Sequence, residues 1–234
     1  MSRMKSLLAA LISLLAISAS AQTHLHGAWV YKQDSITHLV LVTPGYYSYS
    51  VFAAHRFLHT EGGTWRSFAG THAIETTTEF NSSDITKVHV KTTDSNFFSR
   101  FHDKLDQQLP DNGWTHTRSS NTNIEAVWRI TGRQQDGDMK SIPAGARKTI
   151  KLLAGNWFHW AAINTATGEF FGSGGGQFSY VPGNYTETIF FFSRDNSRVG
   201  MTLPFTDQIT QNTWDHQGKS SKGDPIHEIW TTDD

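Results

Sequence analysis

Glu187 and His216 are the two residues of this sequence best suited to chemistry. Glu187 belongs to a segment in which alternate residues share one strand face, and its companions on that face are Tyr185, Ile189 and Phe191. A carboxylate is costly to bury on such an apolar face unless it is paired or hydrogen-bonded. If the fold brings Glu187 and His216 to one cavity, they could act as a general acid and base, and they are our candidate catalytic residues. A structural hydrogen bond is the alternative role for each.

The sequence contains 12 histidines, which raises the question of a metal site. His159 or His227 could join Glu187 and His216 as ligands if the fold gathers them. The compact His-Glu-x-x-His spacing of many zinc enzymes does not occur. The chain has no cysteine, which excludes a thiol nucleophile, and it lacks the Gly-x-Ser-x-Gly motif of serine hydrolases. We therefore predict no metal site and no cofactor.

Aromatic residues are dense around these candidates, and the chain has 8 tryptophans and 15 phenylalanines. Small-molecule sites are typically aromatic cavities with a few polar groups, whereas a filled aromatic core is the alternative. Strand alternation puts Trp157 and His159 on one face, and Phe158 and Trp160 on the other. The predicted ligand-binding residues are Trp157, His159, Trp160, Tyr185, Glu187, Phe191, Arg194, Arg198 and His216.

Arg194 and Arg198 lie four residues apart beside Asp195 in a polar turn. A planar guanidinium can hold a carboxylate, a phosphate or a sugar hydroxyl through parallel hydrogen bonds. The alternative is a surface turn in which arginine and aspartate tie neighbouring strands together. The matching turn of the first half, Asn81-Ser82-Ser83-Asp84, has no arginine, so we predict any site in the second half.

Gly174, Gly175 and Gly176 form a triple glycine. The Lys-Ser/Thr that follows the glycines of a phosphate-binding loop is absent, so nucleotide binding is not predicted. We predict a bulge or a sharp bend of a barrel strand here, because glycine tolerates close backbone approach.

Short segments rich in β-branched and aromatic residues fill most of the chain and are separated by turn residues such as Pro182-Gly183-Asn184. Many short antiparallel strands with tight links predict a meander, which removes its exposed edges by closing into a barrel. One helix is predicted at 94–110, where apolar residues recur at every fourth position and Pro110 ends the pattern. We interpret this helix as a lid over a barrel end or a core edge.

The sequence contains an internal repeat. Asn112-Gly113-Trp114-Thr115-His116 matches Asn212-Thr213-Trp214-Asp215-His216, and each is followed by an apolar strand that ends in a tryptophan, Trp128 or Trp230. The match between the two histidines indicates a structural role for them.

A duplication of this kind divides the mature chain into a degenerate N-terminal copy at 22–127 and a C-terminal copy at 128–234. The predicted fold is all-β, with two tandem antiparallel barrels and one short helix. Because the strand of Trp128 closes one copy and opens the next, one larger continuous barrel or sheet is the alternative.

Residues 1–21 have the order of a secretory signal peptide. Arg3 and Lys5 precede an uncharged apolar run at 7–17, and Ala19-Ser20-Ala21 provides a small-residue cleavage site. We expect cleavage near Ala21 and a secreted or periplasmic protein without a membrane anchor, because the run is shorter than the ~20 residues of a spanning helix. The formal net charge of -1 gives no reason to expect a nucleic-acid partner.

The segment Leu25-His26-Gly27-Ala28-Trp29 resembles the Gly-x-Trp opening of lipocalin-like (calycin) barrels. The second half contains Phe158-His159-Trp160, Gly174-Gly175-Gly176, Tyr185-Thr186-Glu187, the turn at 193–200, Trp214-x-His216 and Ser220-Ser221-Lys222-Gly223-Asp224-Pro225. In these residues it is similar to a family of secreted bacterial lipocalin-like proteins of unknown function. The resemblance implies a barrel and export, and it implies no particular substrate.

Three functions are compatible with these features. The leading prediction is a binding protein that holds a small apolar or aromatic ligand, or a glycan fragment, in the C-terminal barrel, which requires a cavity there. The second is a barrel-interior hydrolase, lyase or isomerase, which requires Glu187 and His216 in one cleft. The third is a structural or interaction module of an extracellular assembly, which predicts an exposed apolar patch and no cavity. We favour binding over catalysis, and the oligomeric state is left open.

Overall fold

The computed structural model describes residues 25–54, 56–67, 74–92, 113–120 and 123–232. Their regular structure is almost entirely antiparallel β-strand, which confirms the all-β prediction. The helices among these residues are two single 3₁₀ turns, η1 (Ile85–Lys87) and η2 (Asn196–Arg198). The predicted signal peptide at 1–21 and the predicted helix at 94–110 lie outside the described residues.

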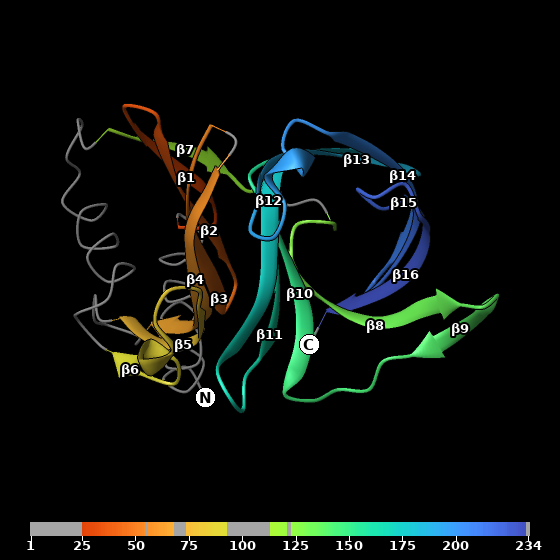
Figure 1. The fold of residues 1–234 in the computed structure, drawn as a ribbon, viewed down its shortest axis with the longest axis horizontal. Coiled ribbons are helices and arrows are strands. Elements are labelled where there is room, and N and C mark those ends of the chain that lie inside the picture. Colours follow the sequence, from red (N-terminus) through yellow and green to blue (C-terminus); the bar gives the residue numbers. More distant parts are fainter. Residues whose placement is uncertain (1–24, 55, 68–73, 93–112, 121–122, 233–234) are drawn as a thin grey trace, which may run out of the picture.

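The first half of the chain forms an open antiparallel sheet of 7 strands (Figure 1). Its spatial order is β6-β5-β4-β3-β2-β1-β7, and within the described residues β6 and β7 are two edges that do not pair with each other. The strands are β1 (Gly27–Gln33), β2 (Ile36–Thr43), β3 (Tyr46–Ala53), β4 (Arg56–Ser67), β5 (Ile74–Asn81), β6 (Lys91–Thr92) and β7 (Trp114–Arg118).

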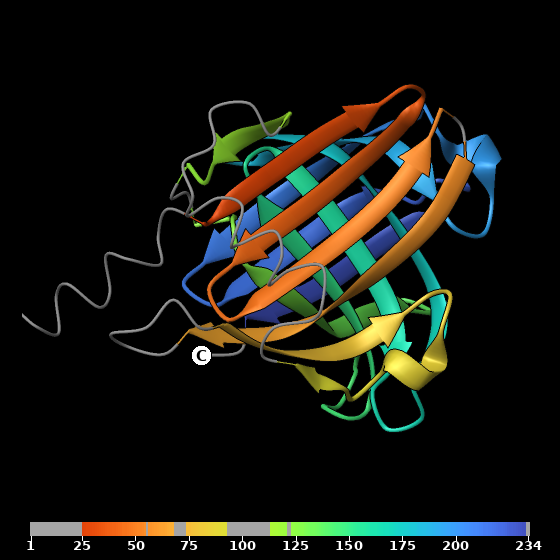
Figure 2. The ribbon, with the colours of Figure 1, turned by 90° about the vertical axis from the view of Figure 1, so that its left-hand side faces the viewer.

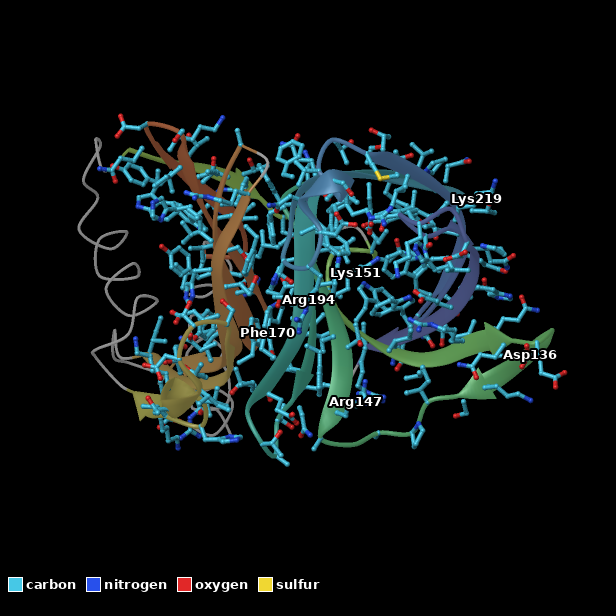
Figure 3. The ribbon with its side chains drawn as sticks, viewed as in Figure 1. Asp136, Arg147, Lys151, Phe170, Arg194 and Lys219 are labelled. Carbon is cyan, nitrogen blue, oxygen red and sulfur yellow. The ribbon has the colours of Figure 1, made fainter. Side chains whose placement is uncertain are left out.

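The second half forms a closed antiparallel barrel of 8 strands. Strands β10 to β16 follow one another in chain order, and β8 closes the ring by pairing with both β16 and β10. A further strand, β9, extends β8 as a hairpin with Asp136 at its projecting tip (Figure 1, Figure 3). The strands are β8 (Val127–Gln135), β9 (Asp138–Ser141), β10 (Arg147–Ala154), β11 (Trp157–Asn164), β12 (Glu169–Val181), β13 (Asn184–Phe192), β14 (Thr202–Thr210), β15 (Thr213–Lys219) and β16 (Pro225–Thr232).

Strand β8 explains why only one of the two sheets closes. One of its edges pairs with β10 at 127–129 and with β9 at 132–135, and the other edge pairs with β16. A strand offers hydrogen bonds along two edges only, so β8 has none left for the first sheet. The predicted antiparallel barrel is therefore present in the second half, whereas the described residues of the first half form an open sheet and not a second closed barrel.

The open sheet packs against the outside of the barrel, over β10 to β13, and Figure 2 shows its strands crossing the barrel strands behind them. Phe52 of β3 and Phe191 of β13 stack across this interface with ring centroids 4.8 Å apart. An ion pair also joins the two layers, with Lys148 Nζ 2.9 Å from Glu79 Oε2. Strands β10, β11 and β13 therefore have two buried faces, one toward the open sheet and one toward the barrel interior.

Two local arrangements occur in both halves. The indole of Trp29 donates to the Leu25 carbonyl at 3.1 Å, and the indole of Trp128 donates to the Ile124 carbonyl at 2.8 Å. Each 3₁₀ turn is capped by an aspartate whose Oδ1 accepts from the backbone two residues later at 3.0 Å, as in Asp195. Both halves therefore begin with the same tryptophan contact and pass through the same capped turn.

The match between His116 and His216 does not extend to the structure. His116 lies on β7, pairs with β1 and stacks on Trp29 with ring centroids 3.7 Å apart. His216 lies on β15, between β14 and β16, and faces the barrel interior. The predicted equivalence of these two histidines is wrong, because β7 pairs directly with the first strand of its sheet, as β16 does in the barrel.

Candidate functional site

The barrel contains a cavity of about 400 Å³ that is lined by the inward-facing residues of seven strands and the β15–β16 turn. Its apolar lining includes Phe158, Trp160, Ile189, Leu203, Phe205 and Trp230. Its charged or titratable lining consists of Arg133, Lys151, Glu187, His216 and Glu228. Figure 3 marks Lys151 on β10, in the barrel half of the molecule. The cavity is thus an aromatic chamber with charged residues on its wall.

Strand β11 divides the predicted ligand-binding residues between its two faces. Phe158 and Trp160 line the cavity, as alternation predicts. Trp157 and His159 point the other way, into the interface with the open sheet, where Trp157 belongs to the apolar core. Trp160 is therefore a cavity residue, and the prediction that Trp157 and His159 contact a ligand in the barrel is corrected.

Strand β13 carries Tyr185 and Glu187 inward, but it does not keep the same face throughout. Its register with β12 shifts between Gly175 and Gly176, so that Ile189 and Phe191 are paired with successive glycines and Phe190 is the extra residue of a bulge. The bulge confirms the role predicted for the triple glycine. It also turns Phe191 outward to the open sheet and Phe192 inward to the cavity, so the assignment of Phe191 to the cavity is wrong.

Lys151 and Glu187 form a buried ion pair, with Lys151 Nζ 2.8 Å from Glu187 Oε1. Tyr185 donates its hydroxyl hydrogen to the same Oε1 at 2.9 Å. Burial raises the pKa of Tyr185 well above its usual value, and the negative charge of Glu187 raises it further, so the hydroxyl keeps its proton. The ammonium also lies over three rings, 5.1 Å from the centroids of Trp214 and Trp230 and 5.8 Å from that of Tyr185.

His216 forms a buried pair with Asp207, which the sequence analysis did not single out. The two side chains are 1% and 0% exposed, and His216 Nδ1 lies 2.8 Å from Asp207 Oδ1. Trp214 donates its indole hydrogen to the same oxygen at 2.9 Å. Because a carboxylate oxygen accepts hydrogen bonds, the bond to Asp207 places a proton on Nδ1 of His216. Since His216 lines the cavity, Nε2 is the ring nitrogen that is not used by Asp207. Asp207 Oδ2 is buried and has no hydrogen-bond partner within the described residues.

Glu228 completes a row of charged residues across the barrel. Asp207, His216, Glu228 and Arg133 are successive cross-strand neighbours on β14, β15, β16 and β8. Arg133 donates to Glu228 Oε1 from Nη2 at 2.7 Å and from Nε at 3.0 Å, and Trp230 donates to Glu228 Oε2 at 3.2 Å. Glu228 therefore has hydrogen bonds on both oxygens.

His159 lies in the interface between the two halves and hydrogen-bonds to residues of both. It is fully buried, its Nε2 lies 2.7 Å from Ser173 Oγ and 3.3 Å from Thr60 Oγ1, and its Nδ1 has no partner in the part of the chain that the structure describes. Burial lowers the pKa of His159 to about 3, so the imidazole is neutral at physiological pH.

Arg194 and Arg198 lie outside the cavity lining. Arg194 donates to the carbonyls of Phe171, at 2.6 Å, and Phe170, at 3.4 Å, and Figure 3 shows it beside Phe170. Arg198 pairs with Asp195 at 2.9 Å and donates to the Ser221 carbonyl. Both guanidinium groups thus join turns and strands, which is the alternative role given above for the pair.

The histidines of the described residues do not assemble into a metal site. His227 bonds to Asp215, with Nε2 3.1 Å from Oδ2, outside the cavity lining, and His159 lies on the opposite face of its strand. Among the described residues, no group of three or more His, Cys, Asp or Glu side chains is arranged to hold a metal ion.

Four residues of the site were not predicted from the sequence: Arg133, Lys151, Asp207 and Glu228. Lys151 had a local signal, since it is a charge between Ile150 and Leu152 in an apolar strand. Arg133 and Glu228 are 95 residues apart in the chain, and only the pairing of β8 with β16 brings them together.

No protein-family model matches the sequence, and no curated protein is significantly similar to it. The closed barrel is compatible with a calycin-like fold. Within the described residues, no helix has the length and apolar character needed to cross a bilayer.

Proposed function

We propose that this protein binds a small molecule with an apolar or aromatic body inside the second-half barrel. The observation that carries the proposal is the cavity of about 400 Å³, whose size falls within the range of ligand pockets. Its aromatic walls supply apolar contact area, and its charged cluster supplies orientation. A purely structural module requires no such cavity.

We further propose that the chain is an exported, lipocalin-like protein that arose by duplication. The signal-like residues 1–21 support export, and the closed barrel is consistent with the lipocalin-like resemblance. The tryptophan contacts of Trp29 and Trp128 and the capped turns at Asp84 and Asp195 support a common origin of the two halves.

Catalysis by Glu187 and His216 is the second candidate function, because both residues line the same cavity. In that reading His216 Nε2 accepts or returns a proton while Asp207 holds the ring. Binding is preferred, since Glu187 is already held by Lys151 and Tyr185.

The binding function is tested by mass spectrometry of molecules that co-purify with the exported protein, in the wild type and in Ala162→Trp. Ala162 lines the cavity, so the indole fills space that a ligand needs. Ala166→Trp is the matched control, because Ala166 is exposed in the turn after β11. We expect a retained molecule in the wild type and in Ala166→Trp, and its loss in Ala162→Trp. Equal retention by all three proteins would contradict a site inside the barrel.

A further inference from the structure

Carboxylates outnumber the lysine and arginine side chains of the barrel interior. Three carboxylates and two such cations lie in or directly beside the cavity: Glu187, Asp207 and Glu228, with Lys151 and Arg133. The third carboxylate, Asp207, has His216 as its partner. An uncompensated buried charge is costly, and a ligand of opposite charge would relieve that cost.

Both cations already have partners. Lys151 is bonded to Glu187 and lies over three aromatic rings, which occupy the space around its ammonium group. Arg133 directs two of its N–H groups at Glu228. The buried Lys151 is therefore poorly placed to attract an anionic ligand, whereas the half-exposed Arg133 has three N–H groups that are not directed at Glu228.

Two buried residues of the cavity wall, Glu187 and His216, keep a polar atom for a ligand, and the partly exposed hydroxyl groups of Thr149, Ser220 and Ser221 also line the cavity. Glu187 is 5% exposed and lines the cavity, and both of its hydrogen bonds end on Oε1, so Oε2 receives none from the described residues. His216 is 1% exposed and its Nδ1 is bonded to Asp207, so in the tautomer that carries its proton on Nδ1 the lone pair of Nε2 is left for a ligand. A ligand that satisfies both atoms has to donate hydrogen bonds.

We propose that the cavity selects a small cationic amine with an aromatic or aliphatic body, an inference that rests on the proposed binding function. The ammonium group is bound by Glu187 Oε2 and His216 Nε2. Trp160, Phe205 and Trp230 line the same cavity and favour a cation near their ring faces.

Three probes with a common phenylethyl body test the inference by isothermal titration calorimetry at neutral pH. They are 2-phenylethylamine, which is cationic, 2-phenylethanol, which is neutral, and 3-phenylpropanoate, which is anionic. We expect the amine to bind about tenfold more tightly than the alcohol, and the anion to bind most weakly. The ranking uses the wild-type protein and therefore does not depend on a variant that folds.

Glu187→Gln removes the charge that the proposal assigns to the ammonium group and keeps the shape of the side chain. Amine affinity should fall about tenfold while that of the alcohol changes little. Glu169→Gln is the matched control, since Glu169 is exposed at the start of β12 and should leave all three affinities unchanged. Circular dichroism reports whether each variant is folded.

An alcohol or carboxylate that binds as tightly as the amine overturns the cation inference and leaves the binding function standing. The same inference fails if a folded Glu187→Gln protein keeps its full preference for the amine. If none of the three probes binds up to millimolar concentration and the purified protein carries no molecule, the binding function fails as well.

Discussion

The open sheet and the barrel bury different residues at matching positions. Trp29 is paired with Val40 in the sheet, and Trp128 is paired with Lys151 in the barrel. Trp65 of the sheet and Phe178 of the barrel are also equivalent, because each donates its backbone N–H to the same position of a turn, Gly45 and Asn156 respectively. The cross-strand partner of Trp65 is Thr76, and that of Phe178 is Glu187. The ion pair of the barrel thus corresponds to a valine and a threonine in the sheet.

This difference teaches that strand pairing does not require the buried charges. Val40 and Thr76 are both fully buried, and the sheet forms with neither a lysine nor a glutamate at these positions. A buried ion pair is also weak evidence for stability, because the loss of hydration offsets much of the attraction. The charges of the barrel are therefore better explained by the cavity that they line.

Replacing the buried lysine of the barrel by the residue at the matching position of the sheet should have the largest effect on stability. Lys151→Val leaves the Glu187 carboxylate buried without its cation and should lower the free energy of unfolding by about 3–5 kcal/mol. Chemical denaturation followed by tryptophan fluorescence measures the change. The double variant Lys151→Val/Glu187→Thr copies both residues of the sheet and should recover at least half of the loss, without binding 2-phenylethylamine. A single variant as stable as the wild type would contradict the pairing described here.

The open sheet has a bulge like that of the barrel, because the register of β4 with β5 shifts between Gly62 and Gly63. Comparing the two bulges gives a smaller expected effect. A Cβ atom at Gly176 would lie 1.9 Å from the Thr188 carbonyl oxygen, and one at Gly63 would lie 2.0 Å from that of Thr77. Alanine at either position should therefore cost about 1–3 kcal/mol of unfolding free energy, because the backbone must shift. Only Gly176→Ala should also weaken ligand binding, since its bulge turns Phe192 toward the cavity.

Gly145→Ala is the control for both glycine variants, because a Cβ there meets no atom within 4 Å. Its unfolding free energy should stay within about 0.5 kcal/mol of the wild-type value. Equal ligand affinity in Gly63→Ala and Gly176→Ala would show that the bulge of the barrel has no special role in binding.

Replacing His159 should have the smallest effect on stability near neutral pH. Because His159 is buried between the two halves, its acid sensitivity measures how tightly their interface is packed. Its pKa is lowered from 6.5 to about 3 by burial, so the unfolded chain takes up a proton at a higher pH than the folded protein does. Stability is therefore retained above pH 6.5 and is lost as the pH falls from there toward 3, by about 2 kcal/mol at pH 5.

His159→Gln should remove this part of the acid sensitivity while keeping a hydrogen bond to Ser173. Urea denaturation of both proteins at pH 7 and pH 5 measures the difference. A wild type and a variant that lose the same stability between these two values would show that His159 is protonated without cost, and that the interface is not closed around it.

Much of the fold could be predicted because it depends on local patterns. Alternation on β11 correctly placed Trp160 and Trp157 on opposite faces of the strand, and the triple glycine predicted the bulge between β12 and β13. The same rule failed at Phe191, since a bulge adds one residue and reverses the faces that follow it. Local alternation could not say which face was the cavity, because both faces of β11 are buried.

The sequence by itself determined the strands, the turns and the glycines that allow the bulges, since these follow from the conformational preferences of short segments. Only the tertiary structure decided which sheet closes, because β8 has two edges and uses both in the barrel. It also decided which charges meet: closure of the barrel brings Lys151 of β10 to Glu187 of β13 across the interior, and the register of β14 with β15 places His216 beside Asp207. Pairing between distant strands leaves no local trace in the sequence, so the chemistry of the cavity emerges only when the barrel is closed.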